Sequence, residues 1–171
     1  MKNIIFVFTY IFVSHCYSEP LRVGNPELLL KYINIHRVEH GLAPLIYDKL
    51  LENAAKMQAV YDYNTYSNLP LKSEHDLHEN KIYPTKISRL NNVGYKFNSK
   101  SGICYENALR YNKLEKQHKL LSELEKVMFT DYKNSIPHNE TMLNNSSTRI
   151  GIYTIYDPVM ECLYNVVVFA N

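Results

Sequence analysis

Several features that would place a protein in a large functional class are missing from this sequence. No apolar run approaches the roughly 20 residues that a membrane-spanning helix needs. Positive and negative charges nearly balance, with 19 Lys and Arg against 17 Asp and Glu, and no basic stripe or nucleic-acid motif occurs. The 5 glycines form no linker that would divide the chain, and no segment is repeated. We therefore expect a single domain without a membrane span and without a nucleic-acid partner.

Common signatures of catalysis and of metal binding are missing as well. The sequence contains no HExxH helix of the kind that holds zinc in proteases, and no CxxC pair. It also has no GxSxG turn, which would present a serine nucleophile. No local motif thus identifies an enzyme.

The N-terminus has the three parts of a secretory signal peptide. A lysine precedes the apolar stretch Asn3–Val13, and Cys16 and Ser18 occupy the −3 and −1 positions of a cleavage site. We expect residues 1–18 to be removed and residues 19–171 to form one extracellular domain. An uncleaved anchor or a buried N-terminal strand is the alternative, and a lipid anchor on Cys16 fits the flanking residues less well.

The chain contains 3 cysteines, of which Cys16 would leave with the signal peptide. Cys104 and Cys162 remain, and two cysteines in an oxidising compartment are candidates for a disulfide. The alternative is a pair of buried free thiols. We expect the disulfide.

The hydrophobic pattern predicts an α+β fold in which helices pack against a small antiparallel sheet. A long loop without periodicity, Asn64–Pro84, separates the second helix from the third. The predicted helices are Asn25–Gly41, Lys49–Tyr63, Thr85–Asn92 and Lys113–Lys133, with a helical turn from Pro137, and the predicted strands are Ile103–Leu109, Arg149–Tyr156 and Val159–Ala170.

Histidines and carboxylates are the residues most able to carry chemistry here. His78 and Glu79 are adjacent, His75 is nearby, and Glu106 and His138 lie further along the chain. Imidazole and carboxylate together suit zinc or a similar divalent cation, and they also suit acid–base work. The alternative is a set of unrelated surface histidines, since the spacing alone does not bring them together.

Three glycosylation sequons occur in one short region. They begin at Asn139, Asn144 and Asn145. They matter only if the chain passes through a eukaryotic secretory pathway, and the sequence leaves open which of them is used.

Several short motifs follow one another along the chain in a characteristic order. They are Tyr32–Leu45 with its Asn-x-x-Arg pattern and Gly-Leu-x-Pro-Leu exit, Asp48 with Leu51–Ala55, His78 followed by Pro84, Arg89, Gly94 and Tyr95, then Tyr105-Glu106-Asn107, Tyr132 with Ser135–His138, and Ile150-Gly151-Ile152. In this order they resemble the CAP superfamily, also called SCP-like extracellular proteins, from about Pro26 to Phe169.

The chain also departs from the family pattern. Tyr105 replaces the glycine of Gly-Glu-Asn, and Tyr132 stands where the family has tryptophan, a residue this chain lacks entirely. The interval from Glu106 to His138 is longer than in compact members. Ser135 occupies the place of a second acidic residue found in many members.

The resemblance implies a three-layer α-β-α sandwich with a shallow cleft. His78 and His138 would face each other there as ligands of zinc or another divalent cation, with Glu106 as a third ligand or as the group that orients them; either His75 or His78 could supply the first histidine. Family members bind sterols, lipids, glycans or proteins, and few are enzymes. We therefore expect a secreted, non-enzymatic binding module, the alternative being a hydrolase that uses a metal-bound water with Glu106 as base.

Overall fold

The computed structural model describes residues 20–66, 77–97, 102–112 and 123–171. The predicted signal peptide and His75 lie outside these ranges, so both stay predictions. Within them, no helix is both long enough and apolar enough to cross a membrane.

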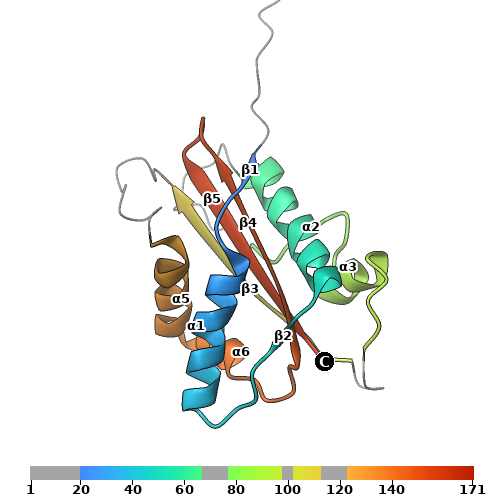
Figure 1. The fold of residues 1–171 in the computed structure, drawn as a ribbon. Coiled ribbons are helices and arrows are strands. Elements are labelled where there is room, and N and C mark those ends of the chain that lie inside the picture. Colours follow the sequence, from blue (N-terminus) through green and yellow to red (C-terminus); the bar gives the residue numbers. More distant parts are fainter. Residues whose placement is uncertain (1–19, 67–76, 98–101, 113–122) are drawn as a thin grey trace, which may run out of the picture.

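A five-stranded sheet forms the middle layer (Figure 1). Its main path runs β1-β4-β5-β3, and β2 pairs with β4 off this path. The β1–β4, β4–β5 and β5–β3 pairs are antiparallel, whereas β2 lies parallel to β4. The strands are β1 Leu21–Arg22, β2 Ile46–Tyr47, β3 Cys104–Asn112, β4 Arg149–Asp157 and β5 Cys162–Ala170.

Helices cover both faces of this sheet (Figure 1). One face carries α2 and α3, and the other carries α1, α5 and α6, which confirms the predicted three-layer α-β-α sandwich. The helices are α1 Pro26–Glu39, α2 Lys49–Tyr66, α3 Lys86–Asn92, α5 Leu124–Asn134 and α6 Ile136–Met142.

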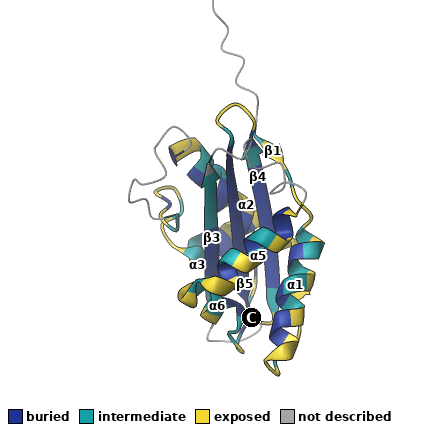
Figure 2. Cartoon of the chain, turned by 90° about the vertical axis from the view of Figure 1, so that its left-hand side faces the viewer, coloured by how far each residue is buried: buried dark blue, intermediate teal, exposed yellow. Residues whose placement is uncertain are grey.

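The central strand β5 belongs to both hydrophobic cores, because successive side chains of a strand point to opposite faces. Val166 and Val168 pack in the core under α2, and Val167 and Phe169 pack in the core under α1 and α5. Every residue of β5 is buried, as Figure 2 shows. This is why its residues are apolar on both faces rather than alternating with polar ones, apart from Asn165, which is buried and hydrogen-bonded to Tyr132 and Thr154.

The helices begin where the sequence supplies capping groups. The Asn25 side chain accepts a hydrogen bond from Leu28 N at 3.1 Å ahead of α1, and Asp48 accepts from Leu50 N at 2.8 Å ahead of α2. Thr85 and Ser88 form a reciprocal capping box at the start of α3. These contacts confirm the helix starts expected from the sequence.

Gly151 allows the backbone of α2 to approach β4 directly. A Cβ atom at this position would lie 2.0 Å from Glu52 N and 2.1 Å from Leu51 C. No side chain fits that space, so the glycine fixes how closely the helical layer packs on the sheet.

Arg37 ties α1 to the chain that follows α6. Its residue is 1% exposed, and its guanidinium donates hydrogen bonds of 2.7 to 3.2 Å to four backbone carbonyls. A buried charge needs such partners because burial removes it from water. The carbonyls belong to Ala43, Met142, Asn144 and Ser147.

Several predicted boundaries differ from the structure. The second helix continues to Tyr66 rather than Tyr63, and β3 continues to Asn112 rather than Leu109. The helix expected over Lys113–Lys133 begins only at Leu124 within the described residues, and residues 113–122 lie outside them. The last strand begins at Cys162 rather than Val159, because the Asp157 side chain accepts from the backbone N–H groups of the next residues and extends the turn.

The predicted disulfide is wrong. Cys104 and Cys162 are both free thiols at opposite ends of the β3–β5 pair, where Cys104 lies opposite Ala170 and Cys162 lies opposite Asn112. At about 3.4 Å per residue they are roughly 27 Å apart, whereas a disulfide needs Cα atoms within about 7 Å. The disulfide was expected from the number of cysteines and an oxidising compartment, and neither gives information on strand register.

Candidate functional site

The predicted site residues lie around the middle of β3, the strand at one end of the sheet path. Glu106 and Asn107 are consecutive, so their side chains point to opposite faces of the sheet. Glu106 contacts the α3 side through Arg89, and Asn107 contacts the α6 side by donating to the His138 carbonyl at 3.0 Å. The two helical layers are thus attached to one edge strand at adjacent positions.

Glu106 is the centre of a buried chain of charges. Its side chain is 0% exposed; Oε1 lies 2.9 Å from His78 Nδ1, and Oε2 lies 2.6 Å from Arg89 Nη2. Arg89 is also buried, with its side chain 1% exposed, whereas the His78 side chain is 34% exposed. The carboxylate therefore has a cation on one oxygen and orients a partly exposed imidazole with the other.

His138 is held on the other side of β3 by packing. Pro137 and His138 form the first turn of α6, and the His138 ring meets the ring of Tyr132 edge-on at 5.3 Å. Tyr132 is itself 0% exposed and donates from its hydroxyl to Asn165 Oδ1 at 2.6 Å. Tyrosine here supplies the packing surface expected from the family's tryptophan.

His138 lies in an environment that disfavours its charged form. Burial lowers the pKa of His138 below its ordinary value, and the positive charge of nearby His78 lowers it further. His138 Nδ1 is buried and has no hydrogen-bond partner within the described part of the chain. The two imidazoles are close enough to influence each other.

The donor set does not fit a metal centre built from all three predicted ligands. Both Glu106 oxygens are already engaged, one of them by a guanidinium, whose charge opposes a second cation at the same carboxylate. A metal-binding histidine normally donates its other ring N–H to a partner, which His138 Nδ1 lacks. Across residues 20–66, 77–97, 102–112 and 123–171, no three His, Cys, Asp or Glu side chains converge to hold an ion.

The sequence identified three of the residues at this edge and missed two. His78, Glu106 and His138 lie where β3 meets both layers, while Arg89 and Asn107 were quoted as motif residues without a role. Arg89 could have been found, because residues four apart share a helix face and Val93, four residues later, packs against the same core as Leu90.

The motif order along the chain has a counterpart in a known family. The model of the cysteine-rich secretory protein family, CAP, matches residues 30–168. The chain belongs to the CAP family. This confirms the resemblance read from the short motifs and explains why they recur in that order.

Several solved structures share this fold. An extracellular SCP-domain protein from Bacillus anthracis is 20% identical with a TM-score of 0.60, and the match covers 85% of this chain and 40% of that one. An outer surface protein from Borrelia burgdorferi is 19% identical with a TM-score of 0.59 over 89% of this chain and 98% of that one. A cysteine-rich secretory protein from Staphylococcus aureus is 15% identical with a TM-score of 0.53 over 85% and 37%.

The matched region is therefore a smaller part of some relatives than of others. The chain spans 40% and 37% of the Bacillus and Staphylococcus proteins but nearly all of the Borrelia protein. No curated protein matches the sequence. At these identities the structural likeness establishes the fold.

Proposed function

We propose that this CAP chain is a secreted, non-enzymatic binding module whose ligand-contact surface is the β3 edge around His78 and His138. The observation that carries the proposal is the state of Glu106, whose two oxygens are committed to Arg89 and His78 in a dry environment. A carboxylate held in this way orients its neighbours. The partly exposed His78 ring is the group that a ligand would meet.

The surroundings of Glu106 argue against acid–base and nucleophilic roles. A general base must accept a proton from a reacting group within hydrogen-bond reach, whereas both Glu106 oxygens are already bonded to His78 and Arg89 and the side chain is 0% exposed. The nearest candidate nucleophile on β3, Cys104, is deactivated because burial first, and then the charge of Glu106, raise the pKa of its thiol to about 12.

Export is part of the same proposal. It is supported by the three-part pattern of residues 1–18. Two structurally similar proteins are described as an extracellular SCP-domain protein and as an outer surface protein. N-terminal sequencing of the protein recovered from culture medium tests this part: a mature N-terminus at Glu19 is expected, and retention in the cell would contradict it.

The binding role is tested with defined probes. Vesicles of phosphatidylcholine with cholesterol and an immobilised glycan array are offered to the wild type, to His78→Ala and to His40→Ala, where His40 is an exposed histidine directly after the last residue of α1. We expect binding to one of the probes that is lost in His78→Ala and kept in His40→Ala. Binding that both variants retain equally would contradict the assigned surface.

The metal and hydrolase alternatives have their own measurement. Calorimetric titration with zinc chloride should give heats that differ little between the wild type and a His78→Ala/His138→Ala variant. A single tight zinc site that disappears in the variant would contradict the conclusion that these side chains do not form a metal centre. Ester hydrolysis that is lost both on chelation and in Glu106→Gln would replace the binding role with catalysis.

A further inference from the structure

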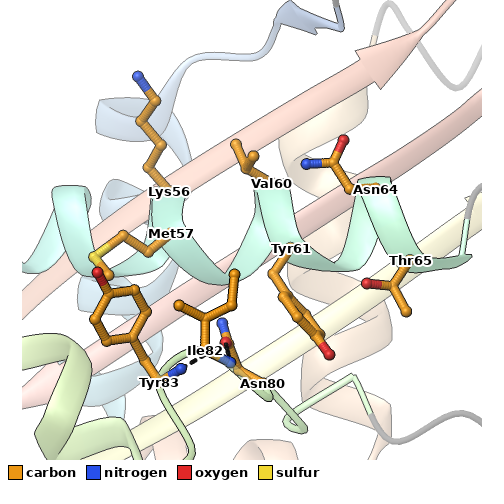
Figure 3. Close-up of a pocket in the computed structure, with 9 residues that line it drawn as sticks. All are labelled: Lys56, Met57, Val60, Tyr61, Asn64, Thr65, Asn80, Ile82 and Tyr83. Carbon is orange, nitrogen blue, oxygen red and sulfur yellow. Dashed lines mark hydrogen bonds between the residues drawn. The ribbon is translucent and has the colours of Figure 1, made fainter.

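A pocket of about 490 Å³ lies on the outer side of α2, between this helix and residues 80–83. The residues of α2 that face the sheet are buried, among them Ala55, Gln58 and Ala59. The helix residues that line the pocket lie between these positions in the sequence and so belong to the other face of the helix. Its opposite wall is formed by Asn80, Ile82 and Tyr83, as Figure 3 shows. The volume lies within the range of small-molecule sites.

The wall of the pocket is fixed to the helix by a buried amide network. Asn80 Oδ1 accepts from Ile82 N at 3.0 Å and from Tyr83 N at 2.9 Å, while Asn80 Nδ2 donates to Gln58 Oε1 at 3.2 Å. Gln58 Nε2 donates in turn to the carbonyls of Leu77 and Glu79. The pocket is therefore formed before any ligand arrives, which lowers the ordering cost of binding.

The lining selects for a ring. Met57, Tyr61, Ile82 and Tyr83 supply thioether, aliphatic and aromatic surface on the two walls, and Ile82 is 70% exposed (Figure 3). Aromatic rings pack well against tyrosine faces and edges and against methionine sulfur. An exposed isoleucine beside two tyrosines would leave water when a flat apolar ligand covers it.

Among the described residues that line the pocket, Lys56 is the one with a charged side chain. Lys56 lines the pocket, and its Nζ lies 5.8 Å from the ring centroid of Tyr153. Within the described ranges Lys56 makes no ion pair, whereas Lys49, two turns earlier on the same helix, is paired with Glu52. Figure 3 shows the Lys56 side chain extending from α2 away from Ile82 and Tyr83. A lysine without a carboxylate partner among the described residues favours a ligand whose one negative charge lies at that end of the pocket.

We propose that this pocket binds a small aromatic anion, with its ring against Met57, Tyr61, Ile82 and Tyr83 and its negative group toward Lys56. This goes beyond the proposed function, because none of the lining residues belongs to the β3 edge. The two sites are nevertheless connected by the segment that carries His78 and by Arg89, whose Nη1 donates to the Tyr83 carbonyl at 3.4 Å.

The probe for this site is 8-anilinonaphthalene-1-sulfonate, an aromatic anion whose fluorescence rises in apolar surroundings. Titration of the folded chain should reveal one saturable site. Val60→Trp fills the pocket and should abolish that signal. Lys56→Gln should weaken the sulfonate about fivefold, the scale of one exposed charge pair, and leave the neutral analogue N-phenyl-1-naphthylamine unchanged.

A matched control exists on α1, where Ile35 and Val38 line a second hollow beside Lys31. Ile35→Trp fills that hollow and should leave probe binding unchanged. Loss of binding in Ile35→Trp, or full binding in Val60→Trp, would overturn the proposal. Near-UV circular dichroism confirms that each variant is folded, and if Val60→Trp does not fold, the different responses of the two probes to Lys56→Gln decide. If Lys56→Gln weakens the binding of both probes equally, the proposed preference for an anionic ligand is wrong.

Discussion

Replacing Arg89 by methionine tests the buried charge chain at the β3 edge. The side chains of Arg89 and Glu106 are 1% and 0% exposed, and their closest atoms are 2.6 Å apart. Removing one partner of such a pair leaves the other charge buried without compensation, which costs about 3–5 kcal/mol. A domain of this size is stable by roughly 5–15 kcal/mol, so Arg89→Met should lower the melting temperature by about 6–20 °C.

A double-mutant cycle separates the pair from the packing around it. Arg89→Met, Glu106→Leu and the double variant are unfolded with urea, and the free energies of unfolding are compared at pH 7. The double variant should be more stable than Arg89→Met alone, because it removes the orphaned carboxylate. As a control, Arg149→Met breaks the half-exposed Arg149–Asp48 pair, and should cost at most about 1 kcal/mol. Additive losses, or an Arg89→Met loss below that of the control, would refute the reasoning.

Three further outcomes follow from the structure. Gly151→Ala should cost more than about 3 kcal/mol in urea unfolding, since the new methyl group would lie 2.0 Å from a backbone atom of α2, and a smaller loss would mean that the layers can separate. The pKa of His138 is lowered in the folded state, so the unfolded chain binds a proton at this residue more readily, and the free energy of unfolding should fall as the pH drops below about 6.5. His138→Gln should flatten this pH dependence, and an unchanged slope would contradict the lowered pKa. Alkylation in denaturant without reductant should label both Cys104 and Cys162. In the folded chain both thiols should react slowly, because burial raises their pKa to about 12 and about 11, respectively. Thiols that resist alkylation in denaturant would instead indicate that the two cysteines form a disulfide.

Much of the fold could be predicted because its signals are local. Asn25, Asp48 and Thr85 mark helix starts by capping, and the apolar run in β5 marks a strand covered on both faces. The short strands β1 and β2 were missed, since two residues carry no periodicity and each strand exists only by pairing with β4. The end of the predicted long helix near Lys133 agrees with α5, which ends at Asn134, whereas its predicted start lies among residues 113–122, outside the described ranges.

The candidate site was less predictable than the fold. His78, Glu106 and His138 were named from residue chemistry and from the family resemblance, yet their partners depend on contacts between distant segments. Arg89 is 17 residues from Glu106, and its role depends on α3 packing against β3. The disulfide failed for the same reason, since strand register decides which residues meet and a count of cysteines does not.

Because Glu106 and Asn107 are adjacent on β3, they help to fix the register of β3 against β5 during folding. A one-residue slip of β3 along β5 would move the Glu106 carboxylate to the α6 face and the Asn107 amide to the α3 face. In the direction that puts Glu106 in the place of Asn107, the acid would meet the His138 carbonyl, another acceptor, and in either direction Arg89 would lose its counter-charge. Both helical layers would lose their attachment in the same event, so the native alignment is favoured over its nearest competitors by two penalties at once.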